Sequence, residues 1–270
     1  MNKTKRKIFE TSMKLFAEKG YDATSIEEIT ANVGVAKGTL YYHFSSKEEI
    51  FQFLIEDLST EILINHVIEK LKAKYPDREI YADTKSFKGI GHLATHGNLM
   101  ERKGGNLLNN LHMYLRGFDR SLASMKQAAI IVVLDNDKRD PEVFRQELEN
   151  VAKETVKLTD CVFCVAVKEM EAWLLGDENA IWEAYPSAKK KFLRDYEQDG
   201  ICDTWQILAN TVYPGGLSEL QKKSQNRYSE IGKAKCEWAD KIGVNLVLEE
   251  NISPSFRFFI NELEMRIASE

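Results

Sequence analysis

The chain has 270 residues, of which 43% are hydrophobic and 29% are charged, and its formal net charge is −5. This composition is typical of a folded globular protein, and the length suits two domains. No apolar run approaches the roughly 20 residues that a membrane-spanning helix needs, and the N-terminus lacks the apolar segment of a secretory signal. We therefore expect a cytoplasmic protein with no membrane partner.

The charge is unevenly distributed along the chain. Residues 1–50 carry eight Lys or Arg and seven Asp or Glu, a balance of +1, which leaves −6 for the rest. Four basic residues form an N-terminal arm: Lys3, Lys5, Arg6 and Lys7. Because electrostatic attraction is screened beyond about 10 Å, such an arm can meet phosphates even on an acidic protein. Without a DNA-binding motif beside it, the arm would be an ordinary solvated terminus.

Three short helices are predicted within the first fifty residues. Apolar residues recur at helical spacing over residues 5–18 and end at Gly20, which suits a C-cap. The sequence TSIEE has the spacing of a capping box and starts a second helix, which stops near Gly34. A third helix is expected over about residues 36–44. Two helices joined by a sharp turn at Gly34 indicate a helix-turn-helix unit.

The segment LFAEKGYDATSIEEITANVGVAKGTLYYHFSSKEEIF resembles the DNA-binding motif of the TetR repressor family over nearly its whole length. The resemblance implies double-stranded DNA as a partner. A palindromic operator favours a homodimer for this motif, although the surface that normally builds a TetR dimer is missing. In the third helix, Leu40 and Phe44 would dock on the other two helices. The residues expected to contact bases or phosphates are Lys37, Thr39, Tyr42, His43 and Lys47.

From about residue 51 the pattern changes to alternating strands and helices. Strands are predicted at residues 51–55, 79–82, 128–134 and 161–167, and helices at 60–72, 106–122 and 141–156. A strand, a helix of about 15 residues and a second strand indicate a right-handed crossover in a parallel sheet. Residues 86–106 are predicted to form a long loop. The C-terminal half is expected to be mostly helical, with one more strand at 244–248.

Two pairs of residues in this part have alternative interpretations. Cys161 and Cys164 have the C-x-x-C spacing of a zinc half-site or a redox pair. Because residues three apart on a strand point to opposite faces, reduced core cysteines are the better prediction. Ser253 and Ser255, in SPSF, either bind phosphate or cap the last helix.

The stretch from residue 51 to the end resembles a family of uncharacterised bacterial proteins with a Toprim-like fold. The resemblance rests on FLIEDLSTEILINHVIEKL, GGNLLNNLHMYLRGFDRSL, IIVVLDNDKRD, VAVKEMEAWLLGD and SPSFRFF. It implies an all-α three-helix helix-turn-helix domain at residues 1–50 and a Toprim-like α/β domain with a mainly parallel sheet at residues 51–270. In a TetR protein KEEIFQFLIEDL would instead be one long helix, followed by an all-helical domain.

Toprim domains hold a divalent metal with an acid after the first strand and a D-x-D after a later one. By resemblance these are Glu56, Asp135 and Asp137, and oxygen ligands of this kind suit Mg²⁺ or Mn²⁺. A further aspartate common in Toprim enzymes is replaced by Arg139. Two additional candidate ligands follow the next strand, in KEMEAW: Glu169 and Glu171. Their alternative is a solvated helix start, where acids favour the helix dipole.

Three functions remain open from the sequence. The leading hypothesis is a transcriptional regulator of TetR type with a fused Toprim-like metal-binding domain. The second is a divalent-metal-dependent nuclease, phosphodiesterase or other nucleic-acid-processing enzyme that the helix-turn-helix delivers to DNA, with no catalytic residue assigned. The third is a non-catalytic scaffold domain, because one fold serves many functions.

Overall fold

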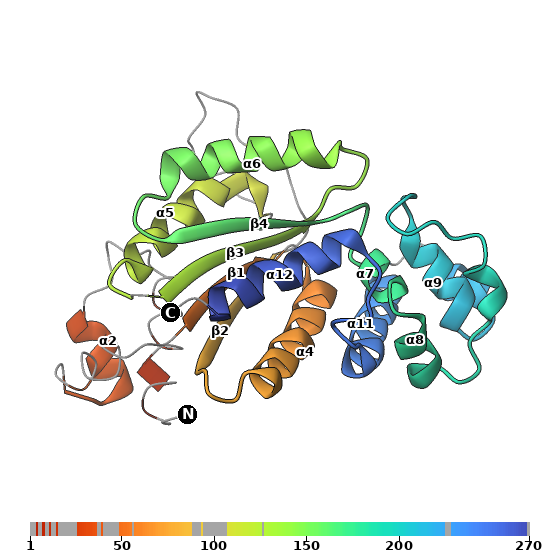
Figure 1. The fold of residues 1–270 in the computed structure, drawn as a ribbon, viewed down its shortest axis with the longest axis horizontal. Helices are drawn as coiled ribbons and strands as arrows, with labels where there is room; N and C mark the ends of the chain where they lie inside the picture. Colours follow the sequence, from red (N-terminus) through yellow and green to blue (C-terminus); the bar gives the residue numbers. More distant parts are fainter. Residues whose placement is uncertain are drawn as a thin grey trace.

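The computed structural model describes residues 26–36, 49–55, 57–87, 107–125, 127–224 and 228–268, together with positions 4, 7, 8, 11, 15, 39 and 93. Figure 1 shows a sheet covered by helices, with the N-terminal helix α2 (Ile26–Val33) at one end and a group of short helices at the other. Within these ranges, no helix combines the length and the apolar character that crossing a membrane requires.

Among the described residues, four strands form one sheet, and every neighbouring pair is parallel. In spatial order the strands are β2 (Ile80–Ser86), β1 (Glu49–Ile55), β3 (Gln127–Asp135) and β4 (Asp160–Ala166). The strand predicted at residues 51–55 is confirmed, so the long helix of a TetR protein is absent over residues 49–55. The parallel α/β sheet is thus as predicted, whereas its Toprim-like identity stays a prediction.

Helices connect the strands and cover both faces of the sheet. The connecting helices are α4 (Leu58–Lys74), α5 (Leu111–Leu122, after the short 3-10 helix η1, Leu108–Asn110) and α6 (Pro141–Thr155). Ile131 and Val133 of β3 pack in the layer of α4, and the alternating Ile130 and Val132 pack in the layer of α5 and α6. Because both faces are covered, β3 is a continuous apolar run rather than an alternating one.

The two cysteines of the C-x-x-C motif are core residues. Both are free thiols on β4, and they lie in opposite layers, with Cys161 on the side of α5 and α6 and Cys164 on the other. Burial raises the pKa of the Cys161 thiol to about 12, and burial raises the pKa of Cys164 as well. Two protonated thiols on opposite faces cannot hold one metal ion, which supports the structural interpretation.

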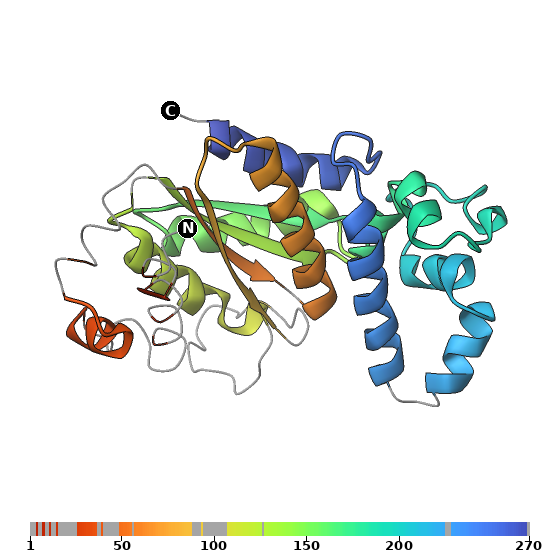
Figure 2. The ribbon, with the colours of Figure 1, turned by 90° about the horizontal axis from the view of Figure 1, so that it is seen from below.

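The C-terminal half is helical, as expected. Its elements are α7 (Glu171–Leu175), α8 (Glu178–Ala184), η2 (Lys190–Phe192), α9 (Thr204–Val212), α10 (Gly216–Ser224), α11 (Tyr228–Asn245) and α12 (Pro254–Ala268). Figure 2 shows α11 beside α4, while α9 and α10 extend away from the sheet. Gly243 lets α11 approach α4 closely, because a Cβ there would lie 2.8 Å from Cδ2 of His66.

The strand predicted at residues 244–248 is wrong. Helix α11 continues to Asn245, and a turn follows. The apolar alternation is real, since Leu246 and Leu248 are buried and Val247 is 41% exposed. The Val247 N–H, however, donates to Oδ2 of Asp177 at 2.9 Å rather than to a neighbouring strand. The alternation therefore belongs to a short segment that lies over the helices.

Asp119, a buried acid on α5, fixes the loop between α6 and β4. Its Oδ2 accepts the N–H of Lys157 at 2.9 Å. Its Oδ1 accepts the N–H groups of Leu158 and Thr159, each at 2.8 Å. The carboxylate thus satisfies three backbone donors immediately before the edge strand begins.

We expect Asp119→Ala to lower the free energy of unfolding by about 3 kcal/mol, because it leaves three partly buried N–H groups without their acceptor. Urea unfolding followed by circular dichroism measures the change. The exposed acid Glu154, replaced by Ala in the same region, serves as the control and should change stability by no more than about 0.5 kcal/mol. Equal effects of the two substitutions would contradict the role assigned to Asp119.

Candidate functional site

The carboxyl ends of the four parallel strands lie along one edge of the sheet. The strand order reverses at β1, because β2 lies on one side of it and β3 and β4 lie on the other. Ligands of open parallel sheets bind at such a point, outside the carboxyl ends of the strands. Acids gather here: Asp57 after β1, Asp135 at the end of β3, and Glu169 and Glu171 after β4. Glu56, the predicted ligand after β1, lies outside the described residues.

Asn136 joins the loops that follow β3 and β4. Its fully buried side chain donates from Nδ2 to the carbonyl of Arg139 and accepts the N–H of Lys168 at Oδ1, both at 2.5 Å. Asp137 also donates its N–H to the carbonyl of Lys168 at 3.1 Å. Asp137 and Lys168 have positive φ angles of 50° and 72°. A left-handed conformation costs a non-glycine residue roughly 1–2 kcal/mol. The hydrogen bonds between the two loops therefore hold both in a conformation that is unfavourable for either loop in isolation.

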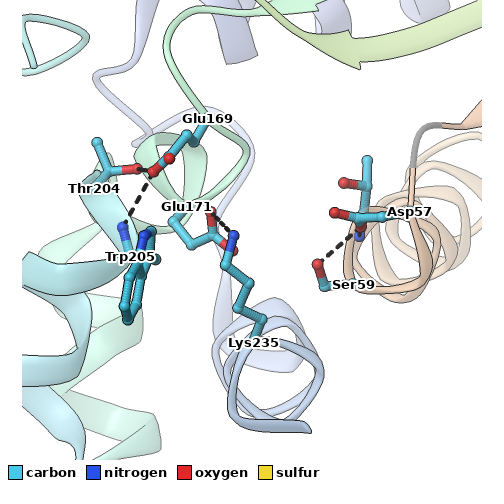
Figure 3. A network of polar contacts seen from close by, with 8 residues as sticks. Asp57, Ser59, Glu169, Glu171, Thr204, Trp205 and Lys235 are labelled. Atoms are coloured by element: carbon cyan, nitrogen blue, oxygen red, sulfur yellow. Dashed lines mark hydrogen bonds and ion pairs between the residues drawn. The ribbon is translucent and has the colours of Figure 1, made fainter. Parts of the chain in front are cut away.

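A buried ion pair lies at the centre of this edge (Figure 3). The side chain of Glu171, at the start of α7, is only 1% exposed. Nζ of Lys235, from α11, lies 3.1 Å from Oε1 and 3.2 Å from Oε2 of this carboxylate. Burial disfavours the ammonium, but the carboxylates of Glu171, Asp135 and Glu169 outweigh burial, and the pKa of Lys235 is raised. Lys235 therefore stays charged and serves as the cation for several acids.

The acids on either side of this pair are held by helix N-termini. Glu169 accepts the hydroxyl of Thr204 at 2.8 Å and the N–H of Trp205 at 3.3 Å, at the start of α9. Asp57 is the N-cap of α4 and accepts the N–H of Thr60 at 2.8 Å. Figure 3 shows Glu169 near Glu171, with Asp57 on a separate helix across from them. Each carboxylate thus has a fixed place at the edge.

The described residues do not by themselves make a metal site. In the part of the chain that the structure describes, no three His, Cys, Asp or Glu side chains are placed to share an ion. Asp137 is half exposed and lies 3.6 Å from Nη1 of Arg139. It lines a cavity of about 570 Å³ with Lys138, Arg139, Glu169, Cys202 and Asp203. Lys235 pairs with Glu171, and the charges of Asp135 and Glu169 raise its pKa further. The predicted Mg²⁺ or Mn²⁺ site stays a prediction that Glu56 would have to complete.

Lys235 was absent from the predicted site, although the sequence contains a signal for it. It precedes Trp238, Ala239 and Ile242 at helical spacings of three, four and seven. All three of those residues are buried, so Lys235 lies on the buried face of α11. A lysine on an apolar helix face requires a buried acid as its partner. Without the fold, nothing indicates that this acid is Glu171, 64 residues earlier.

Ser253 and Ser255 are structural in the observed arrangement. The Ser253 hydroxyl accepts the N–H of Phe256 at 3.3 Å in the first turn of α12. The Ser255 hydroxyl donates to Oδ2 of Asp199 at 3.1 Å and accepts Nε1–H of Trp173 at 2.9 Å. These internal bonds support the capping interpretation over phosphate binding.

At the N-terminal end of the molecule, α2 confirms the second predicted helix. Ile29 and Val33, four residues apart, are buried in a small cluster with Ile8 and Leu15. Gly34 has a φ of 79° and donates its N–H to the carbonyl of Thr30 at 2.8 Å. This left-handed glycine makes the sharp turn that the motif requires.

Of the residues predicted to contact DNA, only Thr39 is described. It is helical and half-buried, and its N–H donates to the carbonyl of Ala36 at 2.9 Å. Lys37, Tyr42, His43 and Lys47 lie outside the described residues. In the predicted basic arm, Lys7 donates from Nζ to the carbonyl of Val33 at 3.0 Å, which satisfies the C-terminus of α2.

The N-terminal part of the chain is similar to known proteins. Residues 8–54 match the family described as bacterial regulatory proteins, tetR family. The chain is 37% identical over 73 residues to the biofilm operon icaADBC HTH-type negative transcriptional regulator IcaR of Staphylococcus epidermidis, which covers 27% of this chain and 37% of IcaR. It is 50% identical over 50 residues to the uncharacterized HTH-type transcriptional regulator YerO of Bacillus subtilis, which covers 18% of this chain and 17% of YerO.

The IcaR of Staphylococcus aureus strain Newman is 46% identical over 48 residues, or 18% of this chain and 26% of that protein. The chain thus spans well under half the length of each of these relatives. No solved structure gives a significant match. The match to the tetR family model ends inside β1, whereas the 73-residue match to the IcaR of Staphylococcus epidermidis extends beyond that strand.

The buried ion pair predicts an asymmetric response to mutation. We expect Lys235→Met to lower the free energy of unfolding by about 3–5 kcal/mol, because the carboxylate of Glu171 is then buried without its cation. The double variant Glu171→Gln/Lys235→Met should recover a large part of the loss. Urea unfolding at neutral pH measures both changes.

The matched control is Lys233→Met on the same helix, where the lysine side chain is 72% exposed and paired with Glu230 on the surface. This substitution should change stability by no more than about 1 kcal/mol. A loss in Lys235→Met no larger than in Lys233→Met would refute the assignment.

Proposed function

We propose that this protein is a DNA-binding transcriptional regulator of the TetR type. The observation that carries the proposal is the agreement between the family match over residues 8–54 and the local structure in the same segment. Helix α2, the left-handed Gly34 and the helical Thr39 follow one another as the motif requires. The relatives that share this segment are named as transcriptional regulators.

The proposed contacts follow from the geometry of a helix-turn-helix. The helix after the turn enters the major groove, and the helix before it crosses the backbone. Thr39, Tyr42 and His43 then supply hydroxyl and imidazole groups to bases or phosphates, and Lys37 and Lys47 flank them on the phosphates. The homodimer that a palindromic operator favours stays a prediction.

Replacing Tyr42 and Lys47 by Ala should weaken binding to duplex DNA. Loss of the lysine should also lower the slope of log affinity against log salt by about one, because one phosphate contact is lost. Fluorescence anisotropy with a labelled duplex at several salt concentrations measures both quantities. The exposed Lys153 of α6, replaced by Ala, is the control and should leave the slope unchanged. Wild-type affinity and slope in a folded double variant would contradict the proposal.

The carboxyl edge supports a second candidate function, the binding of a divalent cation. Four acidic side chains lie at this edge: Asp57, Asp135, Glu169 and Glu171. Among the described residues, Lys235 is the cation that faces Glu171. These carboxylates gather where ligands of parallel sheets bind. We propose that Glu56 and Asp135 complete a site for Mg²⁺ or Mn²⁺. The nuclease hypothesis depends on this ion.

If the ion binds, millimolar Mg²⁺ or Mn²⁺ should raise the melting temperature, since a ligand that binds only the folded state stabilises it by RT ln(1 + [L]/Kd). Asp135→Asn should abolish that gain and stabilise the metal-free protein slightly, because it removes one of several like charges. Calorimetric melting with metal and with a chelator tests this. Asp195→Asn, at an exposed loop position, is the control and should keep the wild-type response. A wild-type melting temperature that is indifferent to metal would rule out the site and the nuclease hypothesis together, and would favour the scaffold.

A further inference from the structure

We infer that a lysine surface on the helical extension is a second contact for the phosphates of duplex DNA. The inference rests on the proposed DNA-binding function. The lysine surface consists of five exposed residues from η2, the residue before it, and the last turn of α10: Lys189, Lys190, Lys191, Lys222 and Lys223. All five lie outside residues 8–54, the segment that matches the family model.

The five lysines are concentrated in an otherwise acidic chain. Residues 186–194 contain three of them and Arg194 but no acid, while the whole chain has a net charge of −5. The nearest acids in the sequence are Glu183, Asp195 and Glu219. Like charges at neighbouring positions repel one another, so this concentration is unfavourable unless an anion balances it.

The two parts of the lysine surface meet at the C-terminal end of α9. Lys189 donates its N–H to the carbonyl of Thr211 at 2.9 Å, in the last turn of that helix. Nζ of Lys223 lies 5.4 Å from the ring centroid of Tyr213, the C-cap of the same helix. Residues more than thirty positions apart in the sequence therefore form one surface.

The five ammonium groups of the lysine surface form no ion pair among the described residues, as is also the case for Lys138, Lys153 and Lys168. Elsewhere Lys72, Lys233 and Lys241 each pair with an acid on their own helix, at 2.6–2.7 Å. Within the part of the chain that the structure describes, this group of cations thus has no carboxylate counter-ion. An external polyanion is the partner that such a surface fits.

Aromatic rings support three of the lysine side chains. Nζ of Lys190 lies 4.9 Å from the ring centroid of Trp182, and Nζ of Lys191 lies 4.9 Å from that of Phe192. Tyr213 supports Lys223 in the same way. Cation–π contacts restrict the side chains without neutralising their charge. Less conformational entropy is then lost when phosphates bind.

The position of the lysine surface explains what it adds to the helix-turn-helix. In both views α2 lies at one end of the molecule and α9 with α10 lies at the other (Figures 1 and 2). The two surfaces therefore contact different phosphates, and the lysine surface lengthens the contacted stretch of duplex. Phosphate contacts carry no base specificity, so it raises affinity for any sequence.

The test is duplex binding by a full-length variant with all five lysines replaced by Gln, measured by fluorescence anisotropy with a mixed-sequence duplex from 50 to 300 mM salt. The salt slope should fall by about 4.5, because each of the five lost phosphate contacts removes about 0.9. The charge-matched control replaces five lysines elsewhere by Gln, and its slope should stay within one of the wild type: Lys72, Lys153, Lys157, Lys233 and Lys241. Circular dichroism melting establishes that both variants are folded.

Equal slopes in the two quintuple variants would overturn the inference. So would loss of binding to a single-stranded probe with an unchanged duplex slope, since that result would assign the surface to single strands. The proposed function fails separately, if Tyr42→Ala/Lys47→Ala binds duplex DNA as the wild type does while the lysine variant does not. If the Tyr42 and Lys47 substitutions weaken binding and the five lysine substitutions do not, the proposed regulator function is retained and the inferred role of the lysine surface is rejected.

Discussion

The hydrogen bonding of β1 to both of its neighbours is the constraint on which the rest of the structure depends. Residues Glu49–Ile55 pair with β2 on one side and β3 on the other, so the strand directly after the N-terminal helices lies inside the sheet. The match to the tetR family model ends at residue 54, within this strand. The segment that matches the family model and the parallel sheet therefore overlap over residues 49–54. The position of β1 also sets the reversal of strand order, and with it the edge where the acids gather.

At that edge, the buried charges fix the relative positions of helices rather than stabilise the fold. A buried ion pair is weak evidence of stabilisation, because the desolvation of both groups offsets their attraction. The pair of Glu171 and Lys235 instead connects α7, directly after β4, to α11, which packs on α4. The left-handed Asp137 and Lys168 hold the neighbouring loops at a further cost. Several unfavourable features at one edge of a sheet are typical of a site that binds or reacts.

The sequence predicts most of the sheet because its signals there are local. β3 and β4 are apolar runs of strand length, and α6 begins where Asp140 and Pro141 supply an N-cap and a first helical residue. The sequence is less decisive for β1, because KEEIFQFLIEDL is compatible with a helix as well as with a strand. Pairing with two neighbours decides between them, and periodicity cannot show that pairing. The strand prediction for residues 244–248 is wrong for the opposite reason. Their apolar alternation is genuine, but no described strand lies beside them to pair with.

The candidate site was less predictable than the fold because its central residue acts over a long distance in sequence. Resemblance indicated Asp135, and position after a strand indicated Glu169 and Glu171. The fold added Asp57 and Lys235, which were absent from the predicted site. The strand β1 also limits how this edge can influence the N-terminal helices. Seven residues in a strand span about 20 Å, and a strand bonded on both sides cannot slip by one residue without turning every side chain to the opposite face. A change at the edge therefore reaches the helix-turn-helix through β1 only as a rigid displacement of the strand together with its neighbours.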